Sequence, residues 1–312
     1  MGDPYLTYAG RASGYAGVTL APGARIAAFV HHSGAAAYTN MDPLIEGRGL
    51  YTTLNAALGQ ARSGAGDVVF VLPGHAENVS TADHMVALVA GTRVVGGGHG
   101  NARPRFTWSA ATATWLFDVA NVTIENCVLE MSGFASGSAL SVAAPITVSA
   151  AGCAIRGCRI RVSDDANELA TIAITTTAAG DDFTIEDCLI HGDPAGEVTT
   201  MVQLVGADRF TMRCCVLVGA TSSTTVGVMR LLTTASLQIT VENCTFINQK
   251  ASSVDAVTGI AAATGVVRDC DFGILDNATL VGWTAKGDLM FFRCQTVNLA
   301  GETGAATTVV ST

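Results

Sequence analysis

The chain has 312 residues, of which 49% are apolar and only 14% charged, and it carries a net charge of −9. Its apolar runs are far shorter than the roughly 20 residues of a membrane-spanning helix, so the apolar content indicates a buried core and no membrane partner. With lysine only at Lys250 and Lys286, no basic stripe is present to bind nucleic acid. No signal-peptide pattern begins the chain, so synthesis in a cytoplasm is expected.

The first 50 residues do not share the pattern of the rest. They are rich in glycine, alanine and tyrosine, with one strand candidate at 26–30. Such a segment needs a partner surface to become ordered. Residues 1–50 are therefore predicted to form an extended N-terminal arm that binds a partner.

Residues 51–66 are predicted to hold a short capping helix. Thr52 and Thr53 are suitable N-caps, and apolar residues follow at helical spacing, at Leu54, Ala57, Leu58 and Ala61. A helix at this place would cover the unpaired strand edges at the start of a β-sheet.

From residue 67 onward the sequence is β-rich and repetitive. Between residues 122 and 296 a short phrase containing a cysteine recurs seven times, at Cys127, Cys158, Cys188, Cys215, Cys244, Cys270 and Cys294. Successive cysteines are 31, 30, 27, 29, 26 and 24 residues apart. A period of this size predicts a β-solenoid over residues 67–300. The tail, 301–312, is expected to cap the last coil or to pair with another subunit.

Each phrase changes side-chain parity once. Val122 and Ile124 share one strand face, whereas Cys127 and Leu129 share a face one residue out of step, so the chain must bend between them. The seven bend residues are Asn126, Gly157, Asp187, Cys214, Asn243, Asp269 and Arg293. Most are residue types that tolerate a left-handed backbone, which predicts strand, tight bend, strand. A third apolar stretch, such as 169–174, closes a triangular coil.

The rhythm of residues 124–129 resembles that of the right-handed parallel β-helix proteins of the pectate-lyase-like superfamily. The resemblance implies an all-β fold. It does not fix a function, because lyases, hydrolases, adhesins and virion parts share this scaffold.

The seven repeating cysteines are predicted to form a structural ladder of buried thiols. In a parallel stack their Cβ atoms lie near the strand spacing of ~4.8 Å, too far apart for disulfides. Cys153 lies off the motif and Cys214 occupies a bend, so these two are the candidates for reactivity.

No catalytic, cofactor or metal site is expected. Charged residues alternate at one strand position, in the order Glu125, Arg156, Glu186, Arg213, Glu242 and Arg268. Opposite charges on neighbouring strands make a structural ladder the preferred interpretation. The pairs Asp164–Asp165 and Asp181–Asp182 are the alternative candidates for cation binding or catalysis.

Histidine and tryptophan give no clear site either. His31 and His32 are adjacent on a predicted strand and are expected on opposite faces, which disfavours a shared metal ion. His75, His84, His99 and His191 show no ligand spacing. The three tryptophans, at 108, 115 and 283, are too scattered to define a sugar-binding groove.

Residues 50–58 and 66–79 resemble the opening of β-helix proteins encoded by tailed bacteriophages. This resemblance implies a structural virion protein, most simply a capsid decoration protein that binds the major capsid protein through its arm, as a homotrimer on the capsid surface. The alternatives are a tail fibre or tailspike component, and a polysaccharide lyase, hydrolase or carbohydrate-binding β-helix protein.

Overall fold

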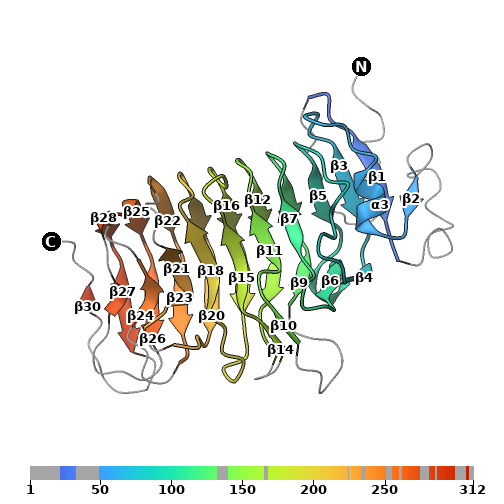
Figure 1. The fold of residues 1–312 in the computed structure, drawn as a ribbon. Coiled ribbons are helices and arrows are strands. Elements are labelled where there is room, and N and C mark those ends of the chain that lie inside the picture. The colour runs from blue at the N-terminus through green and yellow to red at the C-terminus, as the bar shows by residue number, and fades with distance from the viewer. Residues whose placement is uncertain are drawn as a thin grey trace.

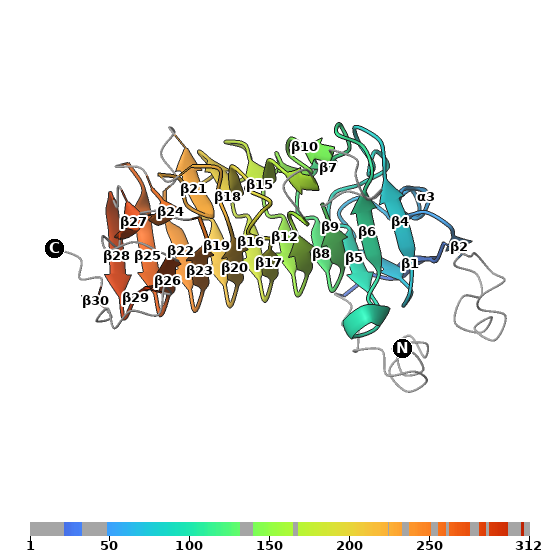
Figure 2. The same cartoon turned by 90° about the horizontal axis from the view of Figure 1, so that it is seen from below.

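The computed structural model describes residues 22–32, 49–131, 140–164, 168–223, 225–232, 237–250, 255–259, 262–274, 281–284, 287–298 and 307–308. Within them the chain is a rod of stacked coils, with parallel strands aligned across its axis (Figures 1 and 2). The crossovers have the usual right-handed sense. The predicted all-β right-handed parallel β-helix is confirmed.

Three long sheets form the faces of the rod. Sheet A contains β2 (Leu50–Tyr51), β1 (Ile26–Val30), β3 (Val68–Val71), β5 (Arg93–Gly96), β8 (Thr123–Glu125), β12 (Ala154–Arg156), β16 (Thr184–Glu186), β19 (Thr211–Arg213), β22 (Ile239–Glu242), β25 (Thr264–Arg268) and β28 (Asp288–Phe292). Sheet B contains β4 (Ala76–Val79), β6 (Arg105–Trp108), β9 (Val128–Glu130), β13 (Arg159–Arg161), β17 (Leu189–His191), β20 (Val216–Gly219), β23 (Thr245–Asn248), β26 (Asp271–Ile274), β29 (Gln295–Asn298) and β30 (Thr307–Thr308).

Sheet C is shorter and begins later in the chain. It contains β7 (Trp115–Phe117), β11 (Ile146–Val148), β15 (Ile172–Thr176), β18 (Thr200–Val205), β21 (Met229–Leu232), β24 (Asp255–Thr258) and β27 (Val281–Thr284). A separate pair, β10 (Leu140–Val142) and β14 (Glu168–Ala170), lies beside it. The described helices are α3 (Leu54–Leu58) and the 3-10 turn η3 (Gly100–Ala102).

The bend between sheets A and B has one backbone geometry throughout. All seven bend residues have φ between 50° and 58°, so the left-handed conformation occurs even at Cys214 and Arg293. Asn126 adds side-chain bonds, because its Nδ2 donates to the carbonyls of Gly96 (2.7 Å) and Gly98 (3.1 Å) in the preceding coil. The bend thus reverses side-chain parity and brings both flanking strands onto the core.

A second left-handed column, which the sequence did not reveal, lies just before sheet A. It comprises Asn121, Gly152, Asp182, Arg209 and Gln238, with φ between 54° and 73°. These residues follow the cysteine spacing of 31, 30, 27 and 29. The five coils that contain β8, β12, β16, β19 and β22 therefore have one tight corner on each side of sheet A.

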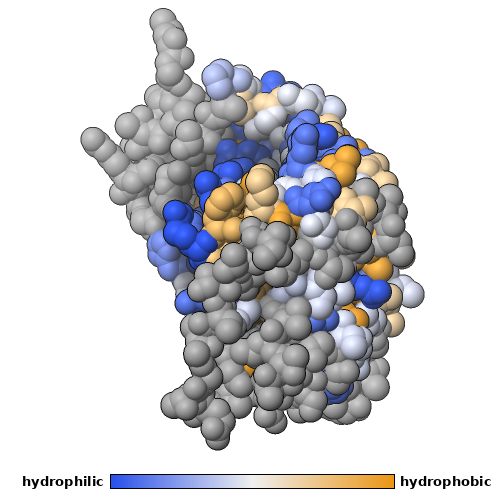
Figure 3. Space-filling view, turned by 90° about the vertical axis from the view of Figure 1, so that its left-hand side faces the viewer, coloured by the Kyte–Doolittle hydropathy of each residue, from blue (hydrophilic) through white to orange (hydrophobic). Residues whose placement is uncertain are grey.

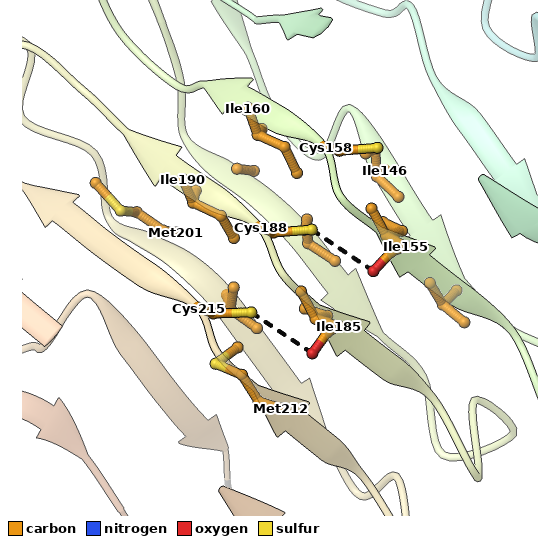
Figure 4. Packing of buried hydrophobic residues seen from close by; sticks show 14 of the residues in the cluster. Ile146, Ile155, Cys158, Ile160, Ile185, Cys188, Ile190, Met201, Met212 and Cys215 are labelled. Carbon is orange, nitrogen blue, oxygen red and sulfur yellow. Dashed lines mark hydrogen bonds between the residues drawn. The ribbon is translucent and has the colours of Figure 1, made fainter. Parts of the chain in front are cut away.

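The cysteine ladder lies inside the rod. All seven thiols are buried and free. Figure 4 shows Cys188 and Cys215 donating to the carbonyls of Ile155 (3.6 Å) and Ile185 (3.5 Å) of the preceding coil. The ladder thus links successive coils through thiol-to-carbonyl contacts while filling the core beside the isoleucine columns.

The N-terminal end is closed by α3 and by a strand from the predicted arm. Thr53 caps α3 by accepting from the Ala56 N–H, and Leu54, Ala57 and Leu58 are buried. Strand β1 pairs in parallel with β3, so this part of residues 1–50 belongs to the solenoid. The buried carboxylate of Asp67 fixes β1 by accepting from the Arg25 N–H at 3.2 Å. Residues 1–21 and 33–48 lie outside the described residues, as does most of the predicted tail.

The C-terminal end carries exposed apolar side chains. Met290 and Phe292, on the last strand of sheet A, are about half exposed, and apolar surface lies beside hydrophilic surface at this end (Figure 3). Within the tail, β30 pairs with β29 in antiparallel orientation.

Candidate functional site

The alternating charges on sheet A contact one another across coils. Arg156 pairs with Glu186 at 3.3 Å, and Glu242 lies between Arg213 (3.3 Å) and Arg268 (2.7 Å). The ladder begins one coil earlier than the sequence indicated, because Arg93 reaches Glu125 at 2.8 Å. On β28 the strand partner of Arg268 is Phe292, an uncharged residue, so the charge ladder ends there. These charges hold neighbouring coils together.

The acidic pairs are also engaged by arginine. Arg209 donates to Asp182 at 2.7 Å and lies 3.3 Å from Asp181, whose other oxygen accepts from the Asp208 N–H. The hydrogen bond from Arg209 lowers the pKa of Asp182, which therefore stays ionised and paired. Asp164 pairs with Arg161, and Asp165 lies outside the described residues. Asp181 and Asp182 therefore share one arginine and are held in a structural contact between coils.

Two histidines bind one carboxylate at the N-terminal end, and His31 and His32 lie beside one of them, His75. Glu77 accepts from Nε2 of His75 and of His84, each at 2.8 Å, and from the Leu54 N–H. The expectation that His31 and His32 lie on opposite faces is wrong, because their ring centroids are 4.4 Å apart. The reason is that β1 ends at Val30, so strand alternation no longer applies.

This cluster is structural in its contacts. Glu77 lies on β4 and joins α3 to the segment that carries His84, so it connects three parts of the first coils. Among the described residues no group of histidine, cysteine, aspartate or glutamate has a geometry that would hold a metal ion.

A different feature, an open groove of about 690 Å³, crosses the outer face of sheet B. We call it the arginine groove. It is lined by Gly100, Asn101, Arg103, Arg105, Val128, Glu130, Arg159, Arg161, His191, Gly192, Asp193 and Pro194. Four arginines against two carboxylates make it a basic site on an acidic protein.

Strand register explains how the groove is assembled. Arg105, Val128 and Arg159 are partners on β6, β9 and β13. Two residues further along the same strands, Glu130 and Arg161 are partners, with His191 beside them on β17. Alternate residues of a strand share a face, so both rows point outward from sheet B. Arg103 enters from the segment after η3.

The four arginines differ in how their charge is balanced. Arg105 pairs with Glu130 at 2.6 Å, and Arg161 pairs with Asp164. Arg159 donates from Nε to Nε2 of His191 at 3.1 Å, and Arg103 donates from Nη1 to the Gly157 carbonyl at 3.0 Å. Within the described part of the chain neither Arg103 nor Arg159 forms an ion pair, and Nε of Arg103 is buried without a partner.

His191 is neutral in this arrangement. A ring nitrogen that accepts from a guanidinium must be unprotonated, so the proton is on Nδ1. Burial and the positive charges of Arg159 and Arg161 lower the pKa of His191. The imidazole therefore holds the Arg159 guanidinium in place without neutralising it.

Comparison with known proteins gives a likeness of fold. No family model matches the chain, and no curated protein sequence is significantly similar. Two solved structures of pectin methylesterase, one a mutant with hexasaccharide IV and one with hexasaccharide VII, match at 12% identity with TM-scores of 0.42 and 0.41. Each match covers 90% of this chain and 91% of the other. At that identity the likeness does not extend to an activity. No helix of the described residues is long and apolar enough to cross a membrane.

The sequence contained a signal for part of the arginine groove. Glu130, Arg161 and His191 each stand three residues after a ladder cysteine, and Val128 and Arg159 stand one residue after one. Aligning the repeats on cysteine would have placed them on one face of neighbouring strands. The tryptophans, by contrast, belong to the core, where all three are buried.

Proposed function

We propose that the chain is a non-enzymatic structural protein of a tailed-phage virion, as a capsid decoration protein attached to the major capsid protein through the segment before β1. The observation that supports a structural role is the engagement of the repeating acids by arginine. Glu186, Glu242 and Asp182 each pair with an arginine one coil away. Such pairs stiffen a rod, whereas a hydrolase needs carboxylates left available to its substrate.

Copy number tests the decoration role. Label-free mass spectrometry of purified virions would count this chain against the major coat protein. A ratio within a small factor of one is expected. A few copies per particle would move the protein to the tail, and its absence from virions would overturn the proposal.

The attachment and the proposed homotrimer need a truncation that spares the solenoid. Because Ala28 and Val30 of β1 are buried, removal of residues 1–21 is the suitable deletion. The shortened protein is expected to keep its β-rich circular dichroism and to lose capsid binding. Native mass spectrometry of the full chain would test the trimer. Retained capsid binding would refute attachment through this segment.

A second candidate function, carbohydrate binding, is favoured by the arginine groove. A protein with a purely structural role does not need guanidinium groups that no carboxylate neutralises. A virion surface protein, a tailspike or an adhesin would each use such a groove for a ligand.

A further inference from the structure

The ligand of the arginine groove must compensate positive charge. Arg159 is exposed, and its hydrogen bond to His191 occupies Nε. Its two terminal nitrogens have no partner among the described residues. Arg103 likewise has a terminal nitrogen to offer besides the one bound to Gly157. Guanidinium groups bind planar carboxylates and sulfates through paired N–H donors, so the groove suits an anionic ligand.

The position of the groove limits the kind of anion. It lies on the face of sheet B, where β6, β9, β13 and β17 are already hydrogen-bonded to neighbours on both sides. A peptide could not add as a strand, because no free sheet edge is offered there. No phenylalanine, tyrosine or tryptophan lines the groove, and the imidazole of His191 is already engaged by Arg159, so the bases of a single-stranded nucleic acid would find no extended stacking platform.

The remaining lining suits a sugar chain. Glu130 and Asp193 can accept hydrogen bonds from hydroxyl groups, while the exposed Pro194 offers a small apolar surface. Four strands at a spacing of ~4.8 Å give a floor roughly 14 Å long, enough for an extended oligomer. Leu189, in register with Arg159 and 38% exposed, continues the apolar surface beyond it.

We propose that the arginine groove binds an acidic oligosaccharide, with its carboxylate or sulfate groups on Arg159 and Arg103 and its hydroxyl groups on Glu130 and Asp193. This inference rests on the second candidate function and names its ligand class. It does not depend on the virion setting, since copy number and attachment are measured without any glycan.

The test measures binding of the full-length protein to defined oligosaccharides by isothermal titration calorimetry at low salt. The probes are an oligogalacturonate and a sulfated oligosaccharide of equal length, with a neutral dextran oligosaccharide as the uncharged control. A polyglutamate peptide and a single-stranded oligonucleotide of the same charge report on the other anion classes. Binding of at least one acidic oligosaccharide, weakened by added salt, is expected.

Variants locate the site. Arg159→Gln is expected to weaken binding about tenfold, as loss of a charge-assisted contact does. The matched control is Arg209→Gln, which removes the same charge outside the groove. Gln238 occupies the corresponding left-handed corner of the next coil, so glutamine is tolerated at such a corner. Glu130→Gln should strengthen binding, because it frees Arg105 and removes a competing anion.

Three results would overturn the inference. One is no binding of either acidic oligosaccharide. Another is an equal loss of affinity in Arg159→Gln and Arg209→Gln, which would mean unspecific charge attraction. The third is tighter binding of the peptide or the oligonucleotide than of the sugars. Circular dichroism of each variant would show that it remains folded, and Glu130→Gln tests the site by gain instead of loss.

Discussion

The carboxylate of Glu77 accepts a hydrogen bond from the backbone N–H of Leu54 at 2.8 Å, and this contact joins the capping helix to β4, the first strand of sheet B. Both oxygens of Glu77 also accept from histidine, so three donors make four hydrogen bonds to one buried acid. Closure of the N-terminal end therefore depends on an ionised side chain.

Glu77→Gln is predicted to destabilise the protein by roughly 1–3 kcal/mol, because an amide NH₂ replaces an acceptor that faces buried donors. Thermal unfolding at neutral pH measures the loss. Glu197→Gln is the matched control, since Glu197 forms an exposed pair with Lys250 at 2.5 Å and should shift the melting temperature little. Equal effects of the two substitutions would show that the histidine cluster does not stabilise the end.

Acid should weaken the same end in two steps. Burial, with the charges of His32 and His75, lowers the pKa of His31, so the unfolded chain takes up this proton first and stability falls as pH drops below about 6.5. The pKa of Glu77 is also lowered, because its histidine and backbone hydrogen bonds outweigh burial. Its contribution is present above the unfolded pKa of about 4.5 and disappears as pH falls through the folded value. Melting temperatures of the wild type and of His31→Phe, measured across this pH range, would separate the two steps. If the melting temperature depends on pH equally in both proteins, the step assigned to His31 is contradicted.

Asp255 has the opposite dependence. Burial raises its pKa to about 6, so the folded state favours the protonated acid and stability is lost as pH rises toward that value. Asp255→Asn is expected to raise the melting temperature near pH 8, because it removes a buried charge while keeping the shape. The gain should vanish below about pH 4, where both states are protonated. A gain independent of pH would contradict this account.

The bend between sheets A and B can be divided into backbone and side-chain contributions. Gly157→Ala should cost about 1 kcal/mol, because an added Cβ meets nothing closer than 4.0 Å and only the left-handed φ is strained. Asn126→Gly keeps the backbone relaxed but removes two hydrogen bonds to the preceding coil, a loss of about 1–2 kcal/mol. Asn126→Ala should combine both penalties. Urea denaturation of the three variants tests this additivity.

Thiol chemistry should single out one cysteine. Cys214 is exposed, whereas the other eight are buried. Burial raises the pKa of Cys127 to about 12, which leaves its thiol protonated and unreactive at neutral pH. Alkylation of the native wild type, followed by mass spectrometry, should therefore detect one label. The native Cys214→Ser variant should take up none, and the denatured wild type should be labelled at all nine thiols. A second native label would mean that a coil opens.

The solenoid could be predicted because every coil repeats the same requirements. Three features recur together in each coil: apolar residues that change strand face at the bend, a left-handed bend residue, and a small buried thiol. Examples are Asn126–Cys127, Asp187–Cys188 and Asn243–Cys244. The second corner was hidden because Arg209 and Gln238 occupy left-handed positions where the residue type gives no warning. There the strand pairing on both sides determines the backbone.

The polar sites were harder to predict because they depend on parts outside the repeat. Arg103 follows η3, which no other coil contains in the described residues, and it reaches Gly157, 54 residues away. His31 meets His75 only because β1 docks beside β3. No local pattern encodes that docking, so the histidine cluster could not be assembled from spacing.

Strand β30 has a consequence for how far the rod can grow. A stack of identical parallel rungs can in principle be continued by another molecule placed end to end, as in a fibril. At the C-terminal edge of sheet B, however, the last strand runs antiparallel to all the others. An incoming molecule would meet a rung of reversed polarity there, while α3 covers the core at the other end. The reversed rung on sheet B and the helix at the other end therefore both act against end-to-end stacking, and they favour particles of one defined length over open-ended filaments.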